Sequence, residues 1–202
     1  YAALYQIDPA KHWITIMPGS RVKEVRMNLP TILDAVKRLG PSCEYLLPVA
    51  PTIDREILQQ RIGKVRVTLV PESLPALWHS RAGIIASGTA TVEAAMMATP
   101  FVMVYRVSAL TYLLGKPRIK VPHFAMVNLI AEEEVVPELV QQDFTAENIV
   151  CRINELLPDG VVRDRQLEGL AKVKASLRSP LASDGRHPAD RAADIILELR
   201  RS

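Results

Sequence analysis

The sequence predicts an α/β fold in which a parallel β-sheet carries helices on both faces. Through the first two thirds of the chain, short β-rich runs alternate with amphipathic stretches that have apolar residues at helical spacing. This alternation is typical of a doubly wound sheet. The fifth of the β-rich runs, Phe101–Tyr105, is almost continuously apolar, as expected of a strand that is covered on both faces.

The expected strands are short and end at turn-forming residues. The first ends at Pro18-Gly19 and the second runs into Pro48, and proline and glycine interrupt regular structure. The expected strands cover residues 13–17, 45–47, 65–70, 82–86 and 101–105.

The helices follow from apolar spacing and from capping residues. Residues 22–39 repeat apolar side chains at helical spacing and are followed by Gly40-Pro41, which ends the helix. Thr145, with Glu147 and Asn148 in the next turn, begins a later helix. The expected helices cover residues 22–39, 53–61, 74–80, 89–98, 108–116, 145–157, 161–177 and 187–201, with a loop at 179–185.

Length and composition indicate one globular domain of 202 residues, with an α/β core at about 12–158 and trailing helices at about 160–202. Hydrophobic residues make up 49% and charged residues 23% of the chain, which argues against disorder. The net charge of +3 is too small to indicate a nucleic-acid partner. The chain opens with Tyr1 and not with methionine, so we expect it to be a piece of a longer protein.

Several classes of site and protein are disfavoured. Cys43 and Cys151 lie far apart without a CxxC motif, and we expect two reduced, buried thiols. The four histidines have no metal-ligand spacing, so we expect no metal site. No apolar stretch approaches the ~20 residues that cross a bilayer.

The loop Pro18-Gly19-Ser20-Arg21 follows the first strand and leads into a helix. Ligands of open α/β sheets bind outside the carboxyl ends of the strands. Gly19 lets the backbone approach a ligand closely, and Arg21 is suited to phosphate, next to the free amide groups of the helix N-terminus. The plainer interpretation is a strand-to-helix turn in which Ser20 is the N-cap and Arg21 is solvated.

A second loop, Ser87-Gly88-Thr89, again joins a strand to a helix, and Glu93 lies one turn into that helix. Small residues at a helix start suit a diphosphate on the backbone amides, and a nearby carboxylate can accept ribose hydroxyls. The alternative is a capped helix whose Glu93 complements the helix dipole. Two such loops on neighbouring strands favour a nucleotide diphosphate, although neither a P-loop nor a GxGxxG motif is present.

Six segments resemble the lipid-A-disaccharide synthase family, and they occur in the family's order. They are residues 18–21, 47–51, 86–95, 104–112, 128–131 and 134–139. The resemblance implies the C-terminal, donor-binding domain of a GT-B glycosyltransferase, which is built from two Rossmann-like domains. The N-terminal acceptor and catalytic domain would be absent from this chain.

The resemblance also implies a reaction and a location. An inverting transfer joins UDP-diacylglucosamine and lipid X into the lipid A disaccharide of lipopolysaccharide and releases UDP. The enzyme would work in the bacterial cytoplasm, peripheral to the inner membrane, without a cofactor or metal and without nucleic acid. A homodimer could form by exchange of C-terminal elements, and this half alone should be inactive.

By the same resemblance, the residues of the two loops are assigned to the UDP-sugar. Gly19, Ser20 and Arg21 would meet the diphosphate, and Ser87, Gly88 and Thr89 would cradle it at a helix terminus. Two further assignments are Glu93 to the ribose and Asn128 to the UDP region. No catalytic residue is expected in this chain, because the family's acidic residue lies in the other domain.

Two residues depart from the family pattern and leave other functions open. Glu133 stands where the family usually has arginine, and Val127 where it has proline. The chain could therefore belong to another UDP-sugar enzyme of the same fold, a transferase or an epimerase, or to a non-catalytic UDP-binding relative.

Residues 112–114, with basic residues at 116, 118 and 120, suggest a surface that rests on anionic lipid, or core packing with a solvated basic rim.

Overall fold

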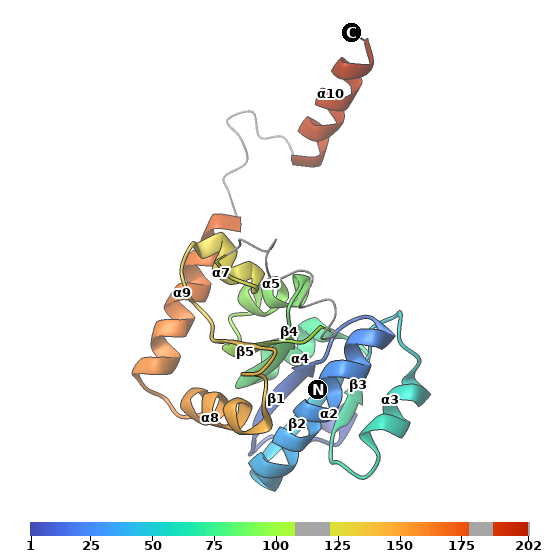
Figure 1. Cartoon of the computed structure of the whole chain (residues 1–202), viewed down its shortest axis with the longest axis vertical. Coiled ribbons are helices and arrows are strands. Elements are labelled where there is room, and N and C mark those ends of the chain that lie inside the picture. Colours follow the sequence, from blue (N-terminus) through green and yellow to red (C-terminus); the bar gives the residue numbers. More distant parts are fainter. Residues whose placement is uncertain (108–121, 178–187, 202) are drawn as a thin grey trace.

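A single parallel sheet of six strands forms the centre of the structure, a computed structural model that describes residues 1–107, 122–177 and 188–201 (Figure 1). The strand order is β3-β2-β1-β4-β5-β6, and every neighbouring pair is parallel. The strands are β1 (His12–Met17), β2 (Cys43–Pro48), β3 (Thr68–Val70), β4 (Ala82–Ala86), β5 (Phe101–Tyr105) and β6 (Glu138–Val140). The α/β, Rossmann-like fold class expected from the sequence is confirmed.

The strand order reverses between β1 and β4. From β1 the chain builds outward through β2 to β3, and it then returns to place β4 on the other side of β1. Such a reversal is the topological switch point of a doubly wound sheet, where loops diverge and leave a crevice. Ile14 is opposite Ala82 and Ile16 is opposite Ile84 in this central pair.

Helices cover both faces of the sheet (Figure 1). One face packs against α2 (Val22–Leu39), α3 (Arg55–Ile62) and α8 (Ala146–Leu156), and the other against α4 (Ser73–His79), α5 (Thr89–Met96), α7 (Met126–Ala131) and α9 (Val161–Leu177). The remaining helical elements are α1 (Ala2–Tyr5), the 3₁₀ turn η1 (Gly40–Ser42) and α10 (Pro188–Arg201).

The central strands alternate side chains between two cores. Ile84 of β4 packs in the core under α2 and α8, and Ile85 packs in the core under α5 and α9. In β5, Val102 packs in the core under α2 and α8, and Phe101 packs in the core under α5 and α9. Because successive side chains of a strand point to opposite faces, burial on both faces requires the continuous apolar runs seen in the sequence.

Most expected elements are confirmed, and the differences have local causes. The expected helix at 53–61 begins at Arg55, because the Asp54 side chain caps it by accepting a hydrogen bond from the Glu56 amide at 2.7 Å. The expected strand at 65–70 pairs with β2 only from Thr68 onward. Four elements were not expected, namely α1, η1, α7 and β6. The helix expected at 108–116, the basic residues beside it and the loop at 179–185 lie outside the described residues.

The two cysteines differ in their surroundings. Both are free thiols, but Cys43 is buried at the start of β2 and Cys151 is exposed on α8. The expectation of two buried thiols is therefore wrong for Cys151, whose position on α8 faces solvent. Burial raises the pKa of the Cys43 thiol. Among the described residues, no helix is both long and apolar enough to cross a membrane.

We predict that hydrogen bonds of the Gln166 side chain stabilise the packing of α9 against the sheet. This side chain accepts a hydrogen bond from the Phe101 amide at 2.8 Å and donates one to the Phe101 carbonyl at 3.2 Å, and both residues are buried. Gln166→Ala leaves two buried backbone groups without partners, so it should lower the free energy of unfolding by about 2 kcal/mol in urea denaturation. Glu168→Ala, on the exposed side of the same helix, should change it by less than about 0.5 kcal/mol. Equal effects of the two substitutions would contradict the prediction.

Candidate ligand-binding cleft

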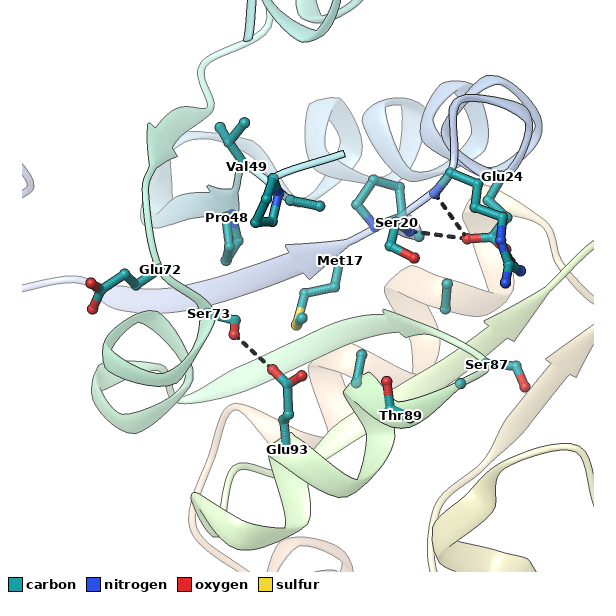
Figure 2. Close-up of a pocket in the computed structure, with 18 of the residues that line it drawn as sticks. Met17, Ser20, Glu24, Pro48, Val49, Glu72, Ser73, Ser87, Thr89 and Glu93 are labelled. Atoms are coloured by element: carbon teal, nitrogen blue, oxygen red, sulfur yellow. Dashed lines mark hydrogen bonds and ion pairs between the residues drawn. The ribbon is translucent and has the colours of Figure 1, made fainter. Parts of the chain in front are cut away.

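A cleft of about 700 Å³ opens at the carboxyl ends of four neighbouring strands, centred on the switch point between β1 and β4. Its walls are residues 17–21 after β1, 48–51 after β2, 71–74 after β3 and 86–90 after β4, with Glu24, Glu93 and Met126. Figure 2 shows these loops around the cleft, with Glu24 at one side and Glu93 at another. The volume lies within the range of small-molecule sites.

Seven of the eight residues predicted from the sequence line this cleft. They are Gly19, Ser20, Arg21, Ser87, Gly88, Thr89 and Glu93. The loops that hold them are more than sixty residues apart in sequence, and the pairing of β1 with β4 brings them together. The eighth residue, Asn128, is not among those that line the cleft.

The start of α5 offers backbone amide groups to the cleft. Gly88 is the N-cap residue with φ of 141°, a conformation that favours glycine, and no side chain caps the helix. Within the described residues, the amides of Gly88, Thr89 and Ala90 have no acceptor. Free amides at a helix N-terminus, together with the helix dipole, favour an anion.

Hydrogen bonds to the protein side hold the loop at residues 87–89, which leads into α5. The Ser87 hydroxyl donates a hydrogen bond to the Phe124 carbonyl at 2.7 Å, and the Thr91 hydroxyl donates one to the Gly88 carbonyl at 2.8 Å. Both hydroxyls therefore face the protein and not the cleft. Ser87 and Thr91 hold the backbone of the loop, and the amides are left as its donor groups.

The loop ahead of α2 is organised differently, because the amides of Ser20 and Arg21 are already occupied. The N-cap is Arg21 and not Ser20, which the plainer interpretation placed there, and the Glu24 side chain three residues later accepts from the Arg21 amide as the N3 residue of a capping box does. Oε2 of Glu24 accepts hydrogen bonds from the amides of Ser20 at 3.0 Å and Arg21 at 3.3 Å, and Oε1 pairs with the Arg21 guanidinium at 2.9 Å (Figure 2). The loop is also held from below by Asn28, whose side chain donates to the Pro18 carbonyl at 2.8 Å.

Glu93 is held in the cleft by one hydrogen bond. The Ser73 hydroxyl, at the start of α4, donates to Oε2 of Glu93 at 2.7 Å (Figure 2). Within the described part of the chain, Oε1 of Glu93 has no partner. The carboxylate is therefore oriented, and one of its oxygens remains available to a hydroxyl group of a ligand.

Asn128 organises the neighbouring backbone and does not contact the cleft. Its side-chain amide donates to the Val136 carbonyl and to Glu138, both at 2.8 Å, and its oxygen accepts from the amides of Val135 and Val136, both at 2.9 Å. Glu138 in turn accepts hydrogen bonds from the amides of Phe124 and Ala125 ahead of α7. Through Phe124, this network supports the loop that contains Ser87.

Glu133, where the family usually has arginine, does not line the cleft either. It lies with Glu134 on a separate hollow between α8 and α9, whose basic residues include Arg152, Arg165 and Lys172. The charge reversal at this position therefore does not face the residues proposed to bind phosphate.

Glu24 and Ser73 were missed by reasoning from the sequence. Glu24 stands at the third position of α2, where an acidic residue suits the helix dipole, but Arg21 is neither serine nor threonine, so no capping-box pattern marks Glu24 in the sequence. Ser73 is close to Glu93 only because α4 and α5 lie together, and no local signal indicates this. Among the described residues, no group of three or more metal-ligating side chains is present.

The arrangement is suited to binding more than to covalent chemistry. It combines free amides, one arginine and one oriented carboxylate, a set of groups that can hold a diphosphate and a hydroxylated sugar ring. Among the described residues, the Ser87 and Thr91 hydroxyls donate to carbonyl groups and not to a side chain that could act as a base.

The sequence of this chain matches a known protein family. The family model of lipid-A-disaccharide synthetase matches residues 1–184. The chain belongs to the lipid-A-disaccharide synthetase family. The family resemblance expected from the sequence is thereby confirmed.

Individual proteins similar to this chain carry the name of the same family. The lipid-A-disaccharide synthase of Koribacter versatilis is 47% identical in an alignment, gaps included, of 203 positions that covers 98% of this chain and 53% of the relative. The enzyme of the same name from Acidobacterium capsulatum is 46% identical in an alignment of 199 positions that covers 91% of this chain and 50% of the relative. The chain thus spans about half the length of these curated relatives.

Among solved structures, the calicheamicin glycosyltransferase CalG4 resembles the chain with a TM-score of 0.58 at 16% identity, over 96% of this chain and 45% of that one. At this identity the likeness concerns the fold alone.

We predict that Asn128→Asp destabilises the support of the cleft. The change removes two N–H donors and places a carboxylate beside Glu138, so the free energy of unfolding should fall by about 3 kcal/mol in urea denaturation. Hydrogen exchange at Val135 and Val136 should accelerate, because repulsion between the new carboxylate and Glu138 opens this network more often even though an acceptor oxygen remains. Asn148→Asp makes the same change at an exposed site in the first turn of α8, where negative charge is tolerated, and should have little effect. Unchanged exchange at Val135 and Val136 would contradict the assigned role.

Proposed function

We propose that the cleft binds the UDP group of a sugar nucleotide, and that this chain is the donor-binding half of a lipid-A-disaccharide synthase. The observation that carries the proposal is the pair of features on α5, namely free amides at its start and the oriented Glu93 carboxylate one turn later. A diphosphate on the amides of Gly88 and Thr89 leaves the ribose within reach of Glu93. Gly19, Ser20 and Arg21 face the diphosphate from the opposite loop.

The reaction proposed for the full-length protein joins UDP-diacylglucosamine and lipid X into the lipid A disaccharide, with inversion at the anomeric carbon and release of UDP. As the bond to UDP breaks, negative charge develops on the diphosphate. The α5 amides and Arg21 are suited to stabilise that charge, which is how preorganised donors lower a barrier. The acceptor site and the catalytic acidic residue belong to the other half, so this chain alone should not catalyse.

We further propose a location and an assembly that fit these substrates. Both are acylated, so the enzyme would work at the cytoplasmic face of the inner membrane without spanning it. Exchange of C-terminal elements between two subunits is supported by the exposed apolar side chains of α10, Ile195, Ile196, Leu197 and Leu199. Covering them against a second subunit would remove apolar surface from water.

We predict that Glu93 recognises the ribose. Glu93→Gln removes a charged acceptor, so calorimetry should show UDP binding weakened about tenfold to a hundredfold, as expected for a hydrogen bond to a charged group. The loss should be confined to the sugar hydroxyls. Wild-type protein should bind 2′-deoxy-UDP more weakly than UDP, and the variant should bind the two alike.

Glu72→Gln provides a matched control for Glu93→Gln. Glu72 also lines the cleft and loses the same charge, but its side chain points away from Glu93 (Figure 2). It should change UDP affinity little. If Glu93→Gln and wild type bind UDP equally, the assignment of the ribose site is wrong.

A second prediction concerns activity. Full-length protein given UDP-diacylglucosamine and lipid X should release UDP and form a disaccharide whose new linkage has the opposite anomeric configuration to the donor. The 202-residue chain should form none under the same conditions. Mass spectrometry and NMR of the product provide the measurement. If they detect disaccharide formed by this chain alone, the chain is more than a donor-binding half.

A further inference from the structure

The carboxylate of Glu24 occupies the position where the α2 loop would hold a ligand anion. It accepts hydrogen bonds from the amides of Ser20 and Arg21 and pairs with the Arg21 guanidinium. These are the donor groups that the loop presents at the cleft, and Glu24 itself lines the cleft. The protein thus supplies an anion of its own to them.

The conformation of Gly19 fits this contact closely. Its φ is +125°, and a Cβ atom built there would lie 2.5 Å from Cβ and 2.6 Å from Oε2 of Glu24. Any side chain at position 19 would therefore collide with Glu24. The sequence suggested that Gly19 allows close approach of a ligand, and the group that lies closest to it in the structure is Glu24.

The two helix starts at the cleft are therefore unequal. The amides of Gly88, Thr89 and Ala90 have no acceptor among the described residues, whereas the amides of Ser20 and Arg21, just ahead of α2, donate to Glu24. The internal contact is exposed, since the side chain of Arg21 is 81% and that of Glu24 35% accessible. Ion pairs this exposed contribute little to stability, so a diphosphate with more than one negative charge can compete for the same donors.

We propose that Glu24 is an internal competitor of ligand phosphate and thereby a specificity-determining residue of the cleft. It holds the amides of Ser20 and Arg21 and the Arg21 guanidinium until a diphosphate displaces it. Ligands without a diphosphate, such as uridine, do not displace it and gain nothing from this loop. The identity of the ligand as UDP rests on the proposed function, but the competition concerns any diphosphate.

Glu24→Gln tests the competition without removing the helix cap, since glutamine also serves in capping boxes. The carboxamide no longer attracts Arg21 or repels phosphate. At low ionic strength, calorimetry should show UDP and inorganic pyrophosphate binding about two- to fivefold more tightly than to wild type, as expected for an exposed charge pair. Uridine affinity should not change. Asp34→Asn removes the same charge from the exposed middle of α2, where Asp34 pairs with Lys37, and should leave pyrophosphate affinity unchanged.

Several outcomes would overturn the inference. Unchanged pyrophosphate affinity in Glu24→Gln would make Glu24 a helix cap only, and weaker affinity would make it a support for Arg21. Absence of pyrophosphate binding to both proteins would also overturn it, and so would a wild-type NMR titration in which pyrophosphate leaves the Ser20 and Arg21 amide resonances unmoved. The NMR measurement does not depend on the folding of the variant. If pyrophosphate shows the expected difference and UDP does not bind, the proposed function is wrong and the competition stands.

Discussion

The parallel pairing of β1 with β4 is the contact on which the rest of the structure depends. It places the loop after Met17 beside the loop after Ala86, and these two loops supply the donor groups of the cleft. Both strands are buried on both faces, so their register is determined by two cores at once. The position of the cleft is consequently set by side chains that do not contact a ligand.

Fold and cleft differed in how far the sequence could predict them. The ranges of α2, β4 and β5 matched because their signals are local: α2 repeats apolar residues at helical spacing and stops at Gly40, and β4 and β5 are continuous apolar runs. The short β6 and α7 escaped prediction, because three and six residues give no period and both depend on the Asn128–Glu138 network. A hydrogen-bond network between segments that meet only in the fold leaves no pattern in the sequence.

The same limit explains the outcome for individual residues of the cleft. Gly19, Gly88 and Glu93 stand at recognisable strand-to-helix turns, so their position at the sheet edge could be predicted. Asn128 was assigned through family resemblance, but its side chain makes four hydrogen bonds with protein groups away from the cleft. Resemblance locates an important residue and does not tell whether it meets the ligand or the backbone behind it.

Within the described residues the sheet contains no hairpin, and this affects how the molecule folds. Every strand pair is parallel, and Ile14 meets Ala82 only after the whole β2–β3 unit between them has been looped out. Contacts of such long sequence separation form late and slow the search for the native state. A partly folded chain that has completed only β1, β2 and β3 lacks the loop after β4, and with it the α5 amides and Glu93. Ligand binding is therefore a property of the finished sheet, and a bound nucleotide can stabilise only molecules that have completed the central pairing.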